Sequence, residues 1–131
     1  MKSSQASSVS LLAEWATLEK LPDVPAGPLR QLTVNLDRVR LKLSENPDGS
    51  LLLESRIKDL PMEEQDREGI LRSAMKTATG RIQSSRSRLV ADASASGLFL
   101  QRVLAAGSTP ADVSQAVEQL ANDVDVWRAT L

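Results

Sequence analysis

The stretch LTVNLDRVRLKLSENPDGSLLLESRIK, residues 32–58, has the pattern of two β-hairpins that follow each other directly. Its apolar side chains fall on even positions up to Leu36 and mainly on odd positions from Val39 onward. A period of two places one side of a strand in the core and the other in water. The change of phase across Asp37-Arg38 indicates a tight turn. Asn46-Pro47-Asp48-Gly49 predicts the second turn, because proline presets φ and glycine accepts a positive φ.

Three antiparallel strands with one apolar face are not stable alone in water, so other segments must cover that face. The first candidate is a helix from about Val9 to Lys20, for which Ser8 is a suitable N-cap. Its apolar stripe consists of Leu11, Leu12, Trp15, Ala16 and Leu18. Pro22 ends this helix, because the residue before a proline avoids the helical region.

A second helix is predicted from Met62 to Thr79, directly after Pro61. Acidic residues crowd its first turns and basic residues follow, which complements the helix dipole. Gly69 costs about 1 kcal/mol of helix propensity, so we expect it to mark a close contact with a neighbouring element. Gly80 is the expected C-terminal stop. The apolar face is narrow and consists of Ile70, Leu71, Ala74, Met75 and Ala78.

A further hairpin is predicted from Leu89–Ala93 and Leu98–Leu104, with its turn near residues 94–97. The second strand is apolar on both faces, since Phe99 and Val103 alternate with leucines. A strand that is apolar on both faces is covered on both faces, and in so small a domain the second cover can come from another chain. We therefore expect a homodimer, whose predicted interface is Leu71, Ala74, Met75, Ala78, Leu98, Leu100 and Leu104.

The C-terminal helix carries the clearest pattern of the chain. Thr109 is a capping residue, Pro110 takes the first helical position, and Asp112 follows in the first turn. The apolar positions after it alternate spacings of four and three residues: Val113, Val117, Leu120, Val124, Trp127 and Leu131. This stripe is too short for a coiled coil, so the pattern favours packing on the sheet, with Trp127 in the core.

Composition narrows the possible functions. The chain has 131 residues, no cysteine and no histidine, which removes disulfides, thiol chemistry and the commonest general base and metal ligand. Glycines are scattered singly and form no phosphate-binding loop. We therefore expect no enzyme activity, no metal and no cofactor. No long apolar run predicts a membrane span, and the polar start predicts a disordered segment 1–8 before a single domain 9–131 in the cytoplasm.

Residues 72–88 include five basic and no acidic side chains, although the net charge of the whole chain is only −1. One alternative function is therefore an α+β domain that binds nucleic acid through Arg81, Arg86 and Arg88. A purely structural interpretation, in which segment 72–88 is a solvent-exposed helix end and loop, is favoured because no aromatic side chain stands among its basic residues to stack on bases. A second alternative is a dimeric adaptor or scaffold.

The whole order of elements resembles the class I type III secretion chaperones, the Tir-chaperone-like partners of injected bacterial effectors. The resemblance covers Val9 to Leu131. Its carriers are "LD" at Leu36-Asp37, "LP" at Leu60-Pro61, the run ILRSAMKTATG, the second hairpin, and the last helix with Trp127. Members of that family are usually distinctly acidic, whereas this chain is almost neutral.

The resemblance implies an α+β fold in which an antiparallel twisted sheet is covered by helices, in a cytoplasmic homodimer. It also implies binding of an effector's N-terminal segment in extended, secretion-competent form, with the secretion ATPase as a further candidate partner. An extended client needs exposed aliphatic surface and free strand edges. Leu52 stands on the otherwise polar side of its strand, and Val90 has a similar parity. The expected client contacts are Leu12, Trp15, Leu18, Leu52 and Val90.

Overall fold

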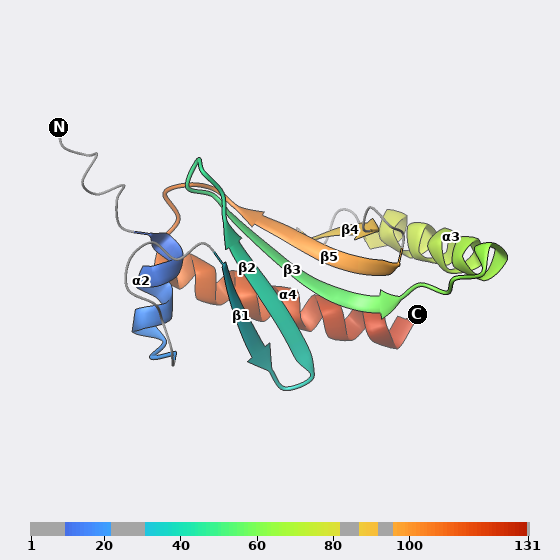
Figure 1. Cartoon of the computed structure of the whole chain (residues 1–131), viewed down its shortest axis with the longest axis horizontal. Coiled ribbons are helices and arrows are strands. Elements are labelled where there is room, and N and C mark those ends of the chain that lie inside the picture. Colours follow the sequence, from blue (N-terminus) through green and yellow to red (C-terminus); the bar gives the residue numbers. More distant parts are fainter. Residues whose placement is uncertain (1–9, 22–30, 82–86, 92–95, 131) are drawn as a thin grey trace.

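The computed structural model describes residues 10–21, 31–81, 87–91 and 96–130. The elements are α2 (Leu11–Leu18), β1 (Gln31–Leu36), β2 (Val39–Glu45), β3 (Leu51–Asp59), α3 (Glu64–Arg81), β4 (Arg88–Ala91), β5 (Gly97–Leu104) and α4 (Pro110–Thr130). Five strands form one antiparallel sheet in the order β1-β2-β3-β5-β4. The chain thus has the predicted α+β order, with α4 along one face of the sheet and α2 and α3 at opposite ends (Figure 1).

The two turns of the first hairpins form where the sequence predicts them. Leu36 pairs with Val39, and Asp37 between them adopts a φ of 51°, which a short polar side chain tolerates. In the second turn the Gly49 N–H donates to the Asn46 carbonyl at 2.9 Å, and Gly49 has a φ of 91°. A type I turn followed by a glycine with positive φ is a common three- to five-residue hairpin connection.

The hydrophobic core lies between α4 and the sheet face that α4 covers, here called the inner face. Each strand places alternate side chains there, and Leu41, Leu43, Leu53 and Leu100 are buried completely or almost so. The predicted stripe of α4 faces them, with Val113, Val117, Leu120, Val124 and Trp127 all buried. The helix begins with a reciprocal cap, in which the Asp112 N–H donates to Thr109 Oγ1 and the Thr109 N–H donates to Asp112 Oδ2.

Two helices differ in detail from their predicted bounds. Helix α2 begins at Leu11, because Ser10 is its N-cap and accepts a hydrogen bond from the Ala13 N–H at 3.1 Å. Helix α3 begins at Glu64 and continues through Gly80 to Arg81, so the prediction that Gly80 stops the helix was wrong. The expected close contact at Gly69 is also absent from the described structure, because a Cβ built there meets nothing within 4 Å.

Several predictions lie outside the described residues. These are the disorder of segment 1–8, the role of Ser8 as N-cap of the first helix, the end of that helix at Pro22, the turn near residues 94–97 apart from its last two residues, and the place of Leu131 in the apolar stripe of the last helix. Side chains of residues 77–81 are likewise not described, which includes Ala78.

Candidate functional site

Helix α2 is fastened to the core through most of its apolar stripe. Leu12 is 0% and Trp15 3% exposed, and the Trp15 Nε1–H donates to Ser114 Oγ of α4 at 2.9 Å. The N-terminus is held as well, since Ser10 Oγ and the Leu12 N–H both donate to the Glu45 carboxylate of β2. Leu18 is the exception, with 62% of its surface exposed. Of the three client contacts expected on this helix, Leu18 has an exposed side chain, whereas Leu12 and Trp15 are core residues.

Helix α3 projects from the end of the sheet (Figure 1). Its surface carries an apolar patch. Met75 is 68% exposed, Leu71 is half-buried, and Ala74 beneath them is fully buried. A shallow open groove of about 420 Å³ runs over the same residues, and its lining is Glu68, Leu71, Arg72, Met75 and Lys76. Four of the seven residues predicted for the dimer interface lie on α3, and of these Leu71 and Met75 offer surface to a second chain, whereas Ala74 is fully buried. The side chain of Ala78 is not described.

The part of the dimer interface that was predicted on strand β5 is wrong for two of its three leucines. Leu98 and Leu100 are 1% exposed and face α4 in the core, so they offer no surface to a second chain. Leu104 is half-buried against the same core. The strand is apolar on both faces as predicted. The side chains on the face away from α4 are Phe99 and Val103, and Val103 is 58% exposed. Edge strand β4 pairs only with β5 in the sheet order, which leaves its other edge open among the described strands.

The face of the sheet opposite α4, here called the outer face, carries both remaining predicted contacts. Leu52 pairs with Val103, and Val90 pairs with Phe99. Val103 and Phe99 are four residues apart on β5, which separates the two pairs by about 13 Å along the strand. Leu52 and Val90 thus share a face without touching, and both are half-buried.

A pocket of about 540 Å³, which was not predicted from the sequence, lies on the outer face beside Val90. It crosses all five strands, and its lining is Thr33, Arg40, Lys42, Glu54, Ser55, Arg56, Val90, Phe99, Gln101 and Arg128. The only local signal in the sequence is that Arg40 and Lys42 alternate with buried leucines on β2. Assembly of the pocket needs the strand order, which no local pattern reveals.

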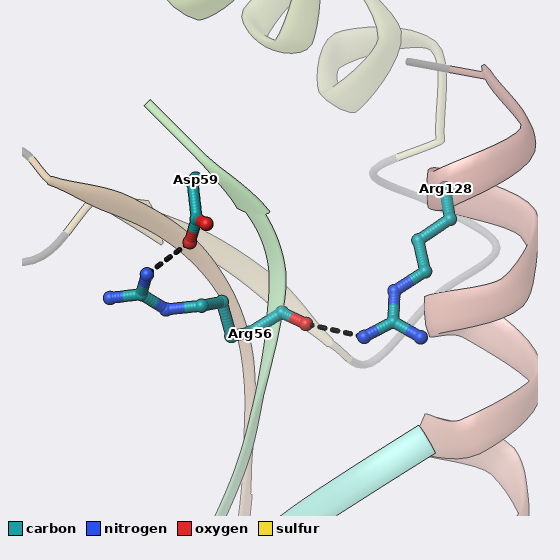
Figure 2. A network of polar contacts seen from close by, with 3 residues as sticks. All are labelled: Arg56, Asp59 and Arg128. Atoms are coloured by element: carbon teal, nitrogen blue, oxygen red, sulfur yellow. Dashed lines mark hydrogen bonds and ion pairs between the residues drawn. The ribbon is translucent and has the colours of Figure 1, made fainter. Parts of the chain in front are cut away.

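Arg128 of α4 lies at the point where β2 and β3 separate. The last paired residues of these strands are Lys42 and Glu54, and beyond them the ladder stops. The Arg128 guanidinium donates to the carbonyl oxygens of Arg38 at 2.7 Å and Arg56 at 2.9 Å. Figure 2 shows the contact of Arg128 with the Arg56 carbonyl, with the Arg56 side chain turned away from Arg128 toward Asp59, with which it forms an ion pair.

Solved structures with this arrangement of elements include chains of chaperone–effector and type III secretion complexes. A chain in the heterodimeric ExoU–SpcU complex from the type III secretion system of Pseudomonas aeruginosa superposes with a TM-score of 0.67 at 15% identity, over 92% of this chain and 97% of that one. A chain of the HopA1–SchA chaperone–effector complex gives a TM-score of 0.65 at 14% identity, over 91% of each chain. A chain of the complex between the Yersinia pestis type III secretion chaperone SycH and a fragment of YscM2 gives 0.63 at 17% identity, over 90% and 97%.

This chain has the class I type III secretion chaperone fold. The resemblance seen in the sequence is thereby confirmed at the level of fold. No protein-family model matches the sequence, and no curated protein is similar enough to it to count as a match.

Within the chaperone fold, the basic segment 72–88 does not assemble into one described patch. Arg72 and Lys76 are exposed on α3, and Arg88 is exposed on edge strand β4. The side chains of Arg81 and Arg86, on which the nucleic-acid alternative relied, lie outside the described part of the chain. None of the helices in the described ranges is both long and apolar enough to cross a membrane.

Proposed function

We propose that this protein is a cytoplasmic chaperone that binds the N-terminal segment of a type III secreted effector, holds it extended and keeps it secretion-competent without turnover. The observation that carries the proposal is the fold, which matches chains of five solved type III secretion complexes over about nine-tenths of the chain. At 14–20% identity such likeness indicates the fold, so the exposed residues must supply the argument for binding.

Exposed aliphatic side chains are what an extended client requires, because side-chain pockets and open strand edges are the means by which extended peptides are bound. Leu18 on α2 and Val103 on the outer face are 62% and 58% exposed. Leu52 pairs with Val103 and adds to the apolar surface there, and Val90 lines the outer-face pocket. These four residues are the proposed client contacts.

The proposed functional unit is a homodimer formed through α3 and the open edge of β4. Met75 and Leu71 form an apolar patch on a helix that makes few contacts with the sheet, and such a patch is more stable when another chain covers it. A second copy that pairs with β4 would also satisfy the main-chain groups at that edge. The secretion ATPase remains a candidate partner on the basis of the resemblance alone.

The test is co-purification from a cell that contains the secreted effectors, followed by identification of the bound protein and of its bound segment. Leu18→Asp combined with Leu52→Asp should abolish capture while the protein stays folded, because both side chains lie at the surface or partly so. Ala111→Asp, an exposed change in the first turn of α4 where an acid is tolerated, is the matched control. Undiminished capture by the folded double variant would contradict the proposed contacts.

A dimeric adaptor outside secretion is the second candidate function. The exposed patch on α3 is compatible with it, since dimerisation does not require a secreted client. The same co-purification separates the two functions: a captured protein whose bound segment is a folded domain would favour the adaptor.

A further inference from the structure

We infer that the outer-face pocket is a selectivity site for acidic side chains of the extended client. The inference rests on the proposed function and deepens it, because it names the chemistry of one client position. The pocket brings together four basic side chains, Arg40, Lys42, Arg56 and Arg128, and a single carboxylate, Glu54. A carboxylate that enters this pocket meets a local excess of positive charge.

The charges on β2 are the ones available to a client. Arg40 and Lys42 are exposed, and within the described residues neither forms an ion pair. The one carboxylate of the pocket, Glu54, stands opposite Lys42 in the β2–β3 ladder and accepts a hydrogen bond from Gln101 Nε2 at 3.1 Å, so it offsets part of the positive charge of β2. An incoming carboxylate therefore meets the two cations of β2 against a single carboxylate, which leaves a net positive charge.

The other two basic groups shape the pocket. The Arg56 guanidinium lies over the Phe99 ring at 5.1 Å from its centroid, in the geometry of a cation–π contact. It can lie there because residue 97 is glycine: a Cβ at Gly97 would come within 2.8 Å of the guanidinium. Arg128 closes the gap between β2 and β3 from the inner side, where Ser55 Oγ also donates to the Arg40 carbonyl at 2.8 Å. Contacts from β2, β3, β5 and α4 thus fix the shape of the pocket.

Charge and shape favour a peptide over a nucleic acid. The net charge of the chain is −1, so it has no general attraction for a polyanion, and the excess of positive charge is local. Phe99 is the one aromatic side chain in the lining, and Arg56 covers its ring, which leaves no open stacking platform for bases. Apolar contacts are available beside the charges at Val90 and, further along β5, at Leu52 and Val103. The matching ligand is an extended segment that carries acidic and aliphatic side chains together.

The experiment uses a fluorescein-labelled dodecapeptide of alternating glutamate and valine, its twin of alternating glutamine and valine, and an oligothymidylate of the same length. Affinity for the full chain is measured by fluorescence anisotropy at low and high salt. The test variant is Arg40→Gln with Lys42→Gln. The matched control is Lys20→Gln with Arg38→Gln, which removes the same two kinds of charge from exposed positions outside the pocket and outside α3. Sedimentation and circular dichroism verify that both variants fold and associate as the wild type does.

The inference predicts that the glutamate peptide binds more tightly than its glutamine twin, with a difference that disappears at high salt. The pocket variant should bind the glutamate peptide about tenfold more weakly, because it loses two exposed charge pairs with the peptide. The affinity of the control variant for the same peptide should change little. Equal binding of the two peptides, or an equal loss in pocket variant and control, overturns the inference but leaves the chaperone function intact. Binding of the oligonucleotide in preference to the glutamate peptide also overturns it. Failure of the proposed function is seen separately, as the absence of a captured client in the co-purification.

Discussion

At the scale of single residues, Trp127 joins the end of α4 to the core. Its side chain is 4% exposed and ends a stripe that is buried from Val113 onward. Trp127→Ala should therefore lower the free energy of unfolding by about 3–5 kcal/mol, the usual loss for a buried large aromatic side chain. Urea unfolding measures it, with Val126→Ala as the control, because Val126 is 38% exposed. A loss under about 1 kcal/mol for Trp127→Ala would mean that the helix end is not docked.

Asp48 should give the β2–β3 turn a dependence on pH. Ser50 donates to Asp48 Oδ1 from its side chain at 2.6 Å and from its N–H at 2.9 Å, and these bonds hold the pKa of Asp48 below its ordinary value of 3.8. The unfolded chain thus binds a proton at higher pH than the folded chain does. The stabilisation is complete above pH 3.8 and is lost as pH falls through the lowered pKa of the folded state.

The variant Asp48→Asn should therefore lose less stability than the wild type when the pH is lowered from neutral into the acid range. Urea midpoints at a series of pH values measure the difference, and Asp125→Asn, on the exposed side of α4, controls for the removal of one negative charge. An acid dependence that is the same in Asp48→Asn and in the wild type would show that the turn makes no such contribution.

At the scale of elements, α3 has a glycine that nothing in the described structure requires. Gly69 lies in the helix interior, is exposed, and has open space where a Cβ would stand. Gly69→Ala should stabilise the protein by about 0.5–1 kcal/mol. Gly49→Ala is the opposite control and should destabilise, since Gly49 has a φ of 91° in the β2–β3 turn. Thermal unfolding measures both changes, and destabilisation by Gly69→Ala would reveal a contact at this position in the proposed dimer.

The elements also show what local patterns can and cannot predict. Alternation placed Ile57 in the core correctly, although the β3–β5 register shifts between Arg56 and Lys58. The reciprocal cap at Thr109 was predictable because both partners lie within four residues. Gly80 was misjudged because its cost in propensity is small enough for a helix to continue through it.

The candidate site was harder to predict than the fold, since its parts are distant in sequence. Arg128 contacts carbonyl oxygens 90 and 72 residues earlier in the chain, which no spacing rule could indicate. Leu12 and Trp15 belong to an amphipathic stripe, and a stripe alone does not tell whether its cover is the same chain or a partner. Here α4 supplies the cover, and only Leu18 remains exposed.

At the scale of the whole molecule, the proposed dimer depends on the patch of α3. Leu71→Asp with Met75→Asp should convert the dimer to a folded monomer, because two charges would be buried in an apolar interface. Analytical ultracentrifugation at micromolar concentration measures the change, with Ala111→Asp as the control. A wild-type chain that sediments as a monomer would contradict the dimer, and a variant that remains dimeric would place the interface elsewhere.

Capture of an extended N-terminal segment distinguishes the proposed chaperone from other dimeric binding proteins. The most direct measurement divides an identified client into its N-terminal segment of some tens of residues and the remainder. Each part is mixed with the purified chain without nucleotide and analysed by size-exclusion chromatography with light scattering. We predict that the N-terminal segment alone forms a stable complex with the dimer and that the remainder does not bind. A complex that forms only with the folded remainder, or only when nucleotide is present, would contradict the proposed function.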